Sequence, residues 1–320
     1  MLQKLEISSY TTIDGKCIHR IPLTYQIFGK PLYQAPIVLV NHALTGNSTV
    51  CGKDGWWSGL IGENKCIDTN KYTILSFNIP GNGYDGIVEN LIEEYKIFNA
   101  RDIATIFLEG LRSLDIDKLY AVIGGSVGGG IAWELAALCP RLIEHLIPIA
   151  TDWKSTDWLK ANCLVQEQIL LNSKNPVYNA RLHAMLMYRT PESFKQKFNR
   201  TYNQEKNIYN VESWLLHHGE KLHNRFTLCA YKELNHILAN IDITKGREGF
   251  LEVAQEIKSD IHIISVDSDK FFTVAEDKIT FKELKQVKQN VNHRIISSVH
   301  GHDAFLIEYE QLSTLLKDVF

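Results

Sequence analysis

Short aliphatic runs that alternate with segments of helical periodicity are the feature that most limits how this 320-residue chain can fold. The runs are apolar at nearly every position, which is typical of strands buried on both faces of a sheet. In the first half of the chain we expect such strands at residues 37–42, 72–78, 119–125 and 142–150. Helical patterns at 101–114 and 127–139 lie between the later strands. Strands joined through helices predict a mostly parallel sheet.

The strand pattern stops after the fourth run, and residues 152–250 are rich in helix formers, Trp, Tyr and Asn. We interpret this stretch as a helical insertion. Strand-like runs return at 261–267 and 293–299 with one helix between them, and a final helix is expected over 304–320. Strands and helices that alternate on both sides of a helical excursion are typical of an α/β sheet that carries a lid.

The chain is therefore expected to have two parts. Residues 1–151 and 251–320 form the α/β core, and residues 152–250 form the lid. Ahead of the parallel strands, two segments within residues 5–30 have the pattern of an antiparallel hairpin, for which we expect a structural role.

The charge balance lacks the basic excess expected of a protein that binds nucleic acids. There are 34 Lys and Arg residues against 37 Asp and Glu residues, a formal net charge of −3, and no basic block exceeds three residues. Proteins that bind nucleic acids generally concentrate basic residues on one surface. We therefore expect small-molecule substrates.

Location and metal content can be judged from the same composition. No apolar stretch reaches the roughly 18 residues that a membrane span needs, and the N-terminal segment lacks a signal-peptide pattern, so we expect a cytoplasmic protein without a membrane partner. The six cysteines are scattered without paired spacing, and we interpret them as buried thiols in a reducing compartment.

A histidine-rich run at 217–223 lacks the HExxH spacing or a comparable ligand set, so no metal is expected.

The segment from Gly124 to Gly128 has the pattern G-x-S-x-G between a predicted strand and a predicted helix. The backbone reverses sharply at such a turn, and small neighbours leave Ser126 standing above the sheet edge. The helix that begins at Val127 directs its N–H groups to the place where an oxyanion would form. A phosphate-binding loop is the alternative, but the lysine of that motif and the GxGxxG spacing are both missing. We interpret Ser126 as a nucleophile.

A serine nucleophile needs a base, and the base needs an acid to orient it. When the nucleophile lies on this kind of turn, the acid follows a late strand and the histidine follows the last one. Asp269 and His302 occupy these two places. Asp267 is the rival acid and His300 the rival base.

A second oxyanion donor is expected from the turn that follows the first parallel strand, at residues 41–46. A backbone N–H from this turn, together with that of Val127, would complete an oxyanion hole. The alternative is an ordinary turn at the end of a strand.

Five motifs, in the same order along the chain, resemble those of the homoserine O-acyltransferase family, which has the α/β-hydrolase fold. They are HALTG at 42–46, GWWSGLIG at 55–62, GGSVGG at 124–129, SDKFF at 268–272 and GHDAFL at 301–306. The resemblance implies that Ser126, Asp269 and His302 form the catalytic triad. It also implies that Leu44 is the oxyanion donor of the first turn.

Two segments of the predicted lid, ARL at 180–182 and MYRT at 187–190, resemble further motifs of the family. Arg181 and Tyr188 are seven residues apart, so they lie on one face of a helix. The resemblance implies that these two residues and Asp303 hold the amino-acid substrate. A guanidinium suits the α-carboxylate and a carboxylate suits the α-ammonium group. Considered without the resemblance, Arg181 is a solvated helix charge and Tyr188 a half-buried core ring.

The reaction that the resemblance implies is a ping-pong transfer of an acetyl group to the hydroxyl of L-homoserine, a step toward methionine. Acetyl-CoA is then a donor substrate, and no tightly bound cofactor is expected. The family also implies a homodimer formed through the lid. Residues 79–90 depart from the glycine-rich turn that the family has after this strand, so the residues that bind CoA stay unassigned.

Three other functions remain open. The first is a transferase with a succinyl-CoA donor or a serine acceptor, because either would keep the triad. The second is an ester hydrolase of the same fold, and the third is a scaffold without catalytic activity.

Overall fold

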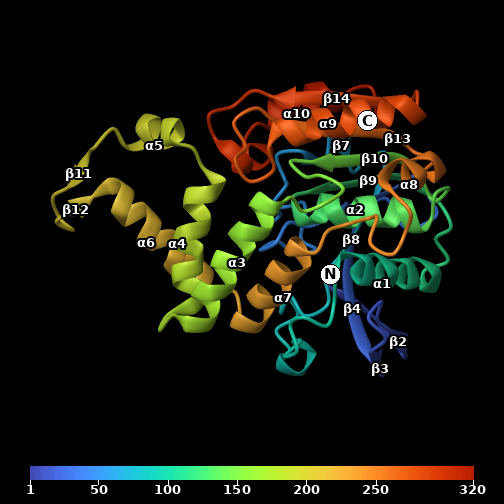
Figure 1. The fold of residues 1–320 in the computed structure, drawn as a ribbon, viewed down its shortest axis with the longest axis horizontal. Coiled ribbons are helices and arrows are strands. Elements are labelled where there is room, and N and C mark those ends of the chain that lie inside the picture. Colours follow the sequence, from blue (N-terminus) through green and yellow to red (C-terminus); the bar gives the residue numbers. More distant parts are fainter.

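An eight-stranded mixed sheet forms the centre of the computed structural model, which describes all 320 residues (Figure 1). From one edge to the other the strands are β1 (Gln3–Ile7), β4 (Ile21–Gly29), β8 (Thr73–Phe77), β5 (Ile37–Asn41), β9 (Leu119–Gly125), β10 (Ile143–Ile149), β13 (Asp260–Val266) and β14 (Val291–Ile296). Strands β1 and β4 are antiparallel, as are β4 and β8, whereas the six strands from β8 to β14 are parallel. The predicted parallel sheet and its antiparallel N-terminal hairpin are confirmed.

Both faces of the sheet are covered, which explains why its strands are apolar at nearly every position. The helices that flank the sheet are α1 (Ala100–Ser113), α2 (Val127–Leu138), α8 (Phe250–Glu256), α9 (Val274–Val287) and α10 (Tyr309–Leu316). In β5, Leu39 belongs to a buried apolar cluster with α1 and α2, while Val38 and Val40 belong to a second cluster with α10. Successive residues of a strand point to opposite faces, so one short run contributes to both clusters.

The lid consists of five helices beside the core and extends to the left in Figure 1. They are α3 (Asp157–Asn172), α4 (Pro176–Tyr188), α5 (Pro191–Phe198), α6 (Asn210–His223) and α7 (Leu228–Ala239). Helices α4 and α5 begin with a proline, whose missing N–H would be unpaired at a helix start in any case. A short hairpin of β11 (Tyr202–Asn203) and β12 (Ile208–Tyr209) lies within the lid and was not predicted, because two-residue strands are too short to show alternation.

The C-terminal prediction was wrong in detail. In place of one helix over 304–320, the chain forms a 3-10 segment, η2 (Gly301–Leu306), and then the shorter helix α10. Gly301 has a positive φ of 64°, which turns the chain sharply at the sheet edge before the helix can begin.

The remaining elements are short. They are β2 (Tyr10–Thr11), β3 (Cys17–Ile18), β6 (Ile61–Gly62), β7 (Ile67–Asp68) and η1 (Val88–Asn90). The expectation of six buried thiols was wrong, because only Cys51 and Cys163 are buried, Cys17 is exposed and the other three are partly buried; all six cysteines are free. None of the helices has the length and apolar character that crossing a membrane requires.

Candidate active site

Ser126 lies in the turn between β9 and α2, with φ 57° and ψ −128°. A positive φ is strained for any residue with a side chain, so the surrounding turn must hold Ser126 in this conformation. A Cβ atom at Gly124 would lie 2.5 Å from the Gly128 carbonyl group, and one at Gly128 would lie 2.5 Å from the carbonyl oxygen of Asn41. The predicted need for small residues around Ser126 is confirmed.

Asp269 and His302 are in direct contact at the carboxyl end of the sheet. His302 Nδ1 donates to Asp269 Oδ2 at 2.7 Å, and both side chains are buried. The other carboxylate oxygen, Oδ1, accepts the N–H groups of Phe271 at 2.7 Å and Phe272 at 3.0 Å. These bonds hold the acid in one orientation, and the acid in turn fixes which ring nitrogen of His302 carries its proton.

The two rival residues are engaged elsewhere. Asp267 accepts the hydroxyl of Ser297 at 2.8 Å and the N–H of Ser298 at 3.0 Å. Nδ1 of His300 lies 3.0 Å from the Ser193 hydroxyl. The structure therefore brings Asp269 and His302 together and leaves Asp267 and His300 outside the pair.

The His302 ring is enclosed by aromatic side chains that also border the nucleophile. The Phe305 ring lies 5.6 Å from the His302 ring, and a Cβ at Gly125 would lie 2.4 Å from Phe305. Phe305 thus packs against both His302 and the residue before Ser126. No hydrogen bond joins the Ser126 hydroxyl to Nε2 of His302, and neither of these two atoms is bonded to another residue, whereas Nδ1 of His302 is bonded to Asp269. Such bonds often form only when substrate is bound.

Two backbone N–H groups beside Ser126 lack an acceptor in the protein. They belong to Val127, the first residue of α2, and to Leu44, in the turn after β5. The Asn41 side-chain amide donates to the Gly128 carbonyl at 3.1 Å and so ties the two turns together. Unpaired N–H groups in this position can receive an oxyanion.

Arg181 and Tyr188 lie on one face of α4, as their spacing predicts. The Arg181 guanidinium is 5.9 Å from the centre of the Tyr188 ring, which is 5.4 Å from the His302 ring. Burial raises the pKa of Tyr188 above its ordinary value, so its hydroxyl stays protonated. Asp303 also lies here, but its carboxylate already accepts Nε of Arg189 at 2.8 Å.

Arg225 was not identified from the sequence. It follows α6 in a segment without a recognisable motif, and only the fold brings it to the oxyanion turn, where Nη1 donates to the Thr45 carbonyl at 3.0 Å. Arg225 is exposed, and partial desolvation of its guanidinium by neighbouring residues, followed by the smaller effect of Arg181, lowers its pKa. Arg181 and Arg225 form no ion pair with a carboxylate, so this side of the site favours an anionic ligand.

A small cavity lies between the lid and the site. Leu44, Tyr188 and Phe271 form its wall on the side of the site. The lid contributes polar groups to the same cavity, among them Gln166 and His183, which are 2.8 Å apart. The lid therefore closes over the region beside the oxyanion turn.

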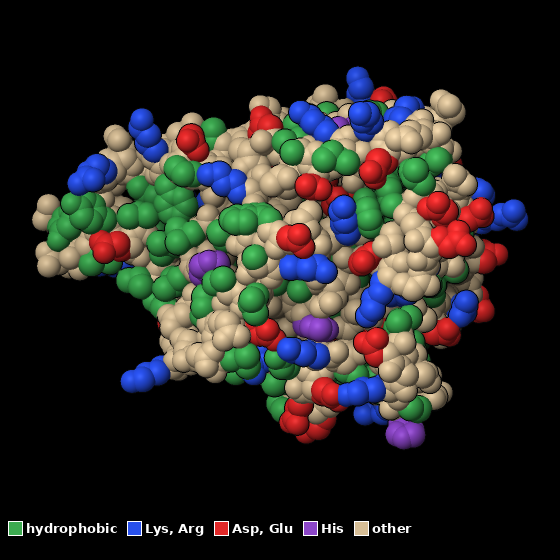
Figure 2. Space-filling model, in the orientation of Figure 1, with side chains coloured by type: hydrophobic (Ala, Val, Ile, Leu, Met, Phe, Trp, Pro, Cys, Tyr) green, Lys and Arg blue, Asp and Glu red, His purple; other side chains and the backbone are tan.

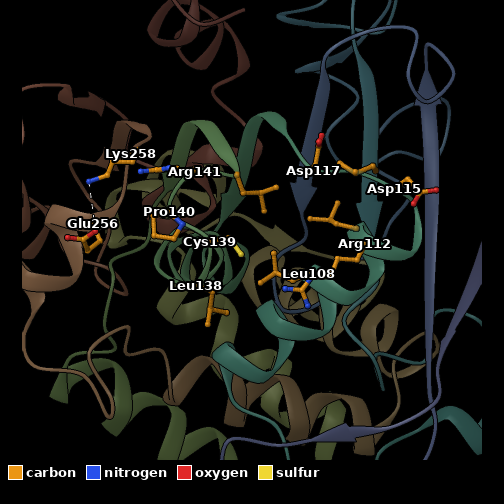
Figure 3. Close-up of a pocket in the computed structure, with 13 residues that line it drawn as sticks. Leu108, Arg112, Asp115, Asp117, Leu138, Cys139, Pro140, Arg141, Glu256 and Lys258 are labelled. Carbon is orange, nitrogen blue, oxygen red and sulfur yellow. Dashed lines mark ion pairs between the residues drawn. The ribbon is translucent and has the colours of Figure 1, made fainter.

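A second, open groove lies at the opposite end of the sheet (Figure 3). It forms where α1 and α2 end and includes Arg112, Asp115, Cys139, Arg141 and Lys258. These residues precede β9 and β10 or follow α8, whereas Ser126 follows β9, so the groove is remote from the site. No group of three or more His, Cys, Asp or Glu residues in the structure could hold a metal ion.

Comparisons with known proteins agree with this architecture. Residues 36–289 match the family model described as the alpha/beta hydrolase fold. A homoserine O-acetyltransferase from Cyclobacterium marinum is 33% identical over 306 residues, which cover 89% of this chain and 84% of that protein.

Solved structures show the same fold at lower identity. Esterase E22 superposes with a TM-score of 0.88 at 20% identity, and all of both chains is covered. A homoserine O-acetyltransferase from Bacillus anthracis superposes with a TM-score of 0.86 at 17% identity, covering 100% of this chain and 97% of the other. The predicted fold class is confirmed.

Proposed function

Because this chain belongs to the homoserine O-acetyltransferase family of the α/β-hydrolase fold, we propose that it transfers an acetyl group from acetyl-CoA to the side-chain hydroxyl of L-homoserine. The observation that carries the proposal is the 2.7 Å contact between His302 and Asp269 at the sheet edge where Ser126 lies, buried, on its strained turn. A base with an oriented tautomer beside a serine on such a turn is the arrangement that acyl transfer through serine needs.

The first half-reaction forms an acetyl-serine. The Ser126 hydroxyl oxygen attacks the thioester carbonyl carbon, His302 accepts the hydroxyl proton, and the N–H groups of Leu44 and Val127 donate to the oxyanion. The carbon–sulfur bond then breaks, and His302 passes its proton to the departing thiolate.

The second half-reaction reverses these proton transfers with a different acceptor. The homoserine hydroxyl attacks the acetyl-serine while His302 accepts its proton, and that proton returns to the Ser126 oxygen as the ester bond to the enzyme breaks. Transfer competes with hydrolysis only where water is kept from the acyl group. The lid cavity that Leu44 and Tyr188 line supports such exclusion.

Charged groups around the site suit an amino acid. Arg181 lacks a carboxylate partner and is proposed to receive the α-carboxylate, with the Tyr188 hydroxyl beside it. Asp303 is proposed to receive the α-ammonium group and would share its carboxylate with Arg189.

Two observations favour specific alternatives. Arg225 is a second guanidinium without a carboxylate partner, and it would suit the free carboxylate of a succinyl donor. The pairing of Asp303 with Arg189 leaves less of the ammonium site open, which favours an ester hydrolase.

Intact-mass spectrometry of the full-length protein tests the proposal directly. Acetyl-CoA should add the mass of one acetyl group to the wild type and none to Ser126→Ala, and L-homoserine should remove it as O-acetylhomoserine. Parallel reactions with succinyl-CoA or with L-serine identify the preferred pair. Release of free acetate at a rate that homoserine does not change would establish a hydrolase instead.

A homodimer through the lid is part of the proposal. Exposed apolar side chains gather on the lid, as Figure 2 shows at the left. They include Leu164, Leu171, Leu186, Tyr202 and Leu216. Apolar surface of this kind is typical of an interface. A single monomeric species in light scattering at micromolar concentration would contradict it.

The cytoplasm is the proposed location. All six cysteines are free, including the exposed Cys17, which suits a reducing compartment.

A further inference from the structure

We propose that His42 is a positioning residue for the oxyanion hole: its imidazole, in the Nδ1–H tautomer, holds the Ala43–Leu44 peptide so that the Leu44 N–H faces the reacting carbonyl oxygen. This inference rests on the oxyanion role proposed above for Leu44. It assigns a function to a side chain of the first turn, whereas the proposed acyl transfer uses only the backbone of that turn.

Hydrogen bonds on both ring nitrogens determine the tautomer of His42. Nδ1 lies 2.8 Å from the Ala43 carbonyl oxygen, which can only accept, so Nδ1 carries the proton. Nε2 lies 3.0 Å from the backbone N–H of Ile79, which can only donate, so Nε2 is unprotonated. The two contacts require the same tautomer, and neither nitrogen is free to act as a base.

The bond from His42 fixes the direction of the Leu44 N–H. The Ala43 carbonyl accepts a second bond, from the Gly46 N–H at 2.8 Å, so two donors hold this oxygen. In a trans peptide the C=O and the following N–H point in opposite directions. An immobilised Ala43 carbonyl therefore leaves the Leu44 N–H pointing away from both donors, and that N–H has no acceptor in the protein.

His42 stays neutral over the pH range in which an enzyme of this kind works. It is 1% exposed, and burial lowers its pKa to about 4. The polar groups that face the ring are the Ala43 carbonyl, the Ile79 N–H and the Asn82 amide, whose Nδ2 is 3.4 Å from Nε2. None of them carries a charge that could stabilise an imidazolium.

The segment that donates a hydrogen bond to Nε2 of His42 is the one that departs from the family pattern. Ile79 and Asn82 both belong to residues 79–90, which follow β8. Asn82 is held in turn by Asn78, whose side-chain oxygen accepts its amide at 3.1 Å. The oxyanion turn is thus braced by a segment from a neighbouring strand, and His42 connects the two.

Asparagine and glutamine divide the two functions of the ring. An asparagine amide nitrogen occupies roughly the place of Nδ1, so His42→Asn can still donate to the Ala43 carbonyl. A glutamine side chain reaches roughly the place of Nε2, so His42→Gln can accept from Ile79 but loses the bond to Ala43. If His42 had only a structural role, the two variants would lower the acylation rate equally.

The experiment compares the wild type, H42N and H42Q in the burst of p-nitrophenol that accompanies acetylation of Ser126 by p-nitrophenyl acetate. We expect the acylation rate of H42Q to fall about 10- to 100-fold, less than the roughly 100- to 1000-fold that complete loss of an oxyanion donor produces, because the Leu44 N–H is misaligned and not removed; that of H42N should fall less than about fivefold. KM for L-homoserine and the melting temperature should be similar in the two variants. Equal losses of rate, or losses that follow the melting temperature, would overturn the proposal.

A measurement on the wild type keeps the proposal testable if the variants do not fold. In ¹⁵N–¹H correlation spectra of the labelled full-length protein, the His42 ring, assigned through its contact with the Ile79 N–H, should remain a neutral Nδ1–H tautomer from pH 5 to 9. If the assigned His42 ring carried its proton on Nε2, it could not donate to Ala43 and the proposal would fail. Acylation by p-nitrophenyl acetate needs neither CoA nor homoserine, so failure of the proposed acyl transfer would be recognised separately.

Discussion

Replacement of Asp152 by asparagine should make the protein more stable, and more so as the pH rises. Asp152 is 2% exposed and follows β10. Its Oδ1 accepts the Trp153 N–H and the Thr280 hydroxyl, each at 2.8 Å, whereas Oδ2 has no partner. Asparagine keeps the acceptor Oδ1 and replaces the unpaired oxygen with a neutral amide. The variant therefore removes a buried charge without removing a hydrogen bond.

The size of the stability difference follows from the Asp152 carboxyl proton, which the folded state keeps to a higher pH than the unfolded state does. Burial raises the pKa of Asp152 from an ordinary value of 3.8 to about 6. The stability linked to the protonated carboxyl is complete below about pH 3.8 and is lost as the pH rises to about 6. At about 1.4 kcal/mol per pH unit, the whole loss is about 3 kcal/mol, of which about 1.4 kcal/mol falls above pH 5.

Urea unfolding at pH 5 and pH 8 measures this difference. The free energy of unfolding of Asp152→Asn, relative to the wild type, should be larger at pH 8 by about 1.4 kcal/mol. Asp117→Asn is the matched control, because Asp117 is exposed and its replacement should leave the pH dependence unchanged. The reasoning is refuted if Asp152→Asn shows the same difference at both pH values or is less stable than the wild type at pH 8.

Three further substitutions test the site and the lid. Asp269→Asn should lower kcat about 10³- to 10⁴-fold, because the amide no longer fixes the His302 tautomer. Asp267→Asn is the control and should change kcat less than about threefold, because the Asp267 side chain bonds only to the neighbouring loop. Similar losses of kcat in steady-state assays of the two variants would contradict the assignment of Asp269. Arg181→Gln should raise KM for L-homoserine about 10- to 100-fold through the loss of a charged hydrogen bond, and an unchanged KM would remove Arg181 from the substrate site. Glu233, in α7, is fully buried with both carboxylate oxygens unpaired, and burial raises its pKa well above the ordinary value. Glu233→Gln should therefore be more stable than the wild type at pH 8, with a gain that shrinks toward pH 5 in thermal unfolding; a loss of stability at pH 8 would show that the carboxylate has a partner in solution.

The candidate nucleophile could be predicted with its environment because that environment is local. Ser126 lies within five residues of the glycines that make room for it, and the strand before it and the helix after it are visible as apolar patterns. The choice between Asp267 and Asp269 was of another kind. Both follow the same strand two residues apart; the motif at 268–272 favoured Asp269, and the position of η2 shows that Asp269 is the one that meets His302.

Several parts of the site left no readable pattern. Arg189 pairs with Asp303 across 114 residues, and Arg225 reaches the Thr45 carbonyl across 180 residues. Contacts of this kind depend on where the lid sits relative to the core. An arginine at the surface of a helix has the same sequence context whether it faces solvent or a substrate.

The amino-acid sequence by itself determined the parallel sheet, the lid as a separate helical excursion and the order of the serine, acid and histidine. These properties follow from hydrophobic periodicity and turn chemistry, which act between residues close along the chain. Tertiary structure alone brought Arg225 to the oxyanion turn and bonded His42 between two turns, and it showed that Asp269, the acid favoured from the sequence, is the one that meets His302. Those pairings join segments that are distant in sequence. They depend on strand register and helix position, because a shift of one residue along a strand turns each of its side chains to the opposite face.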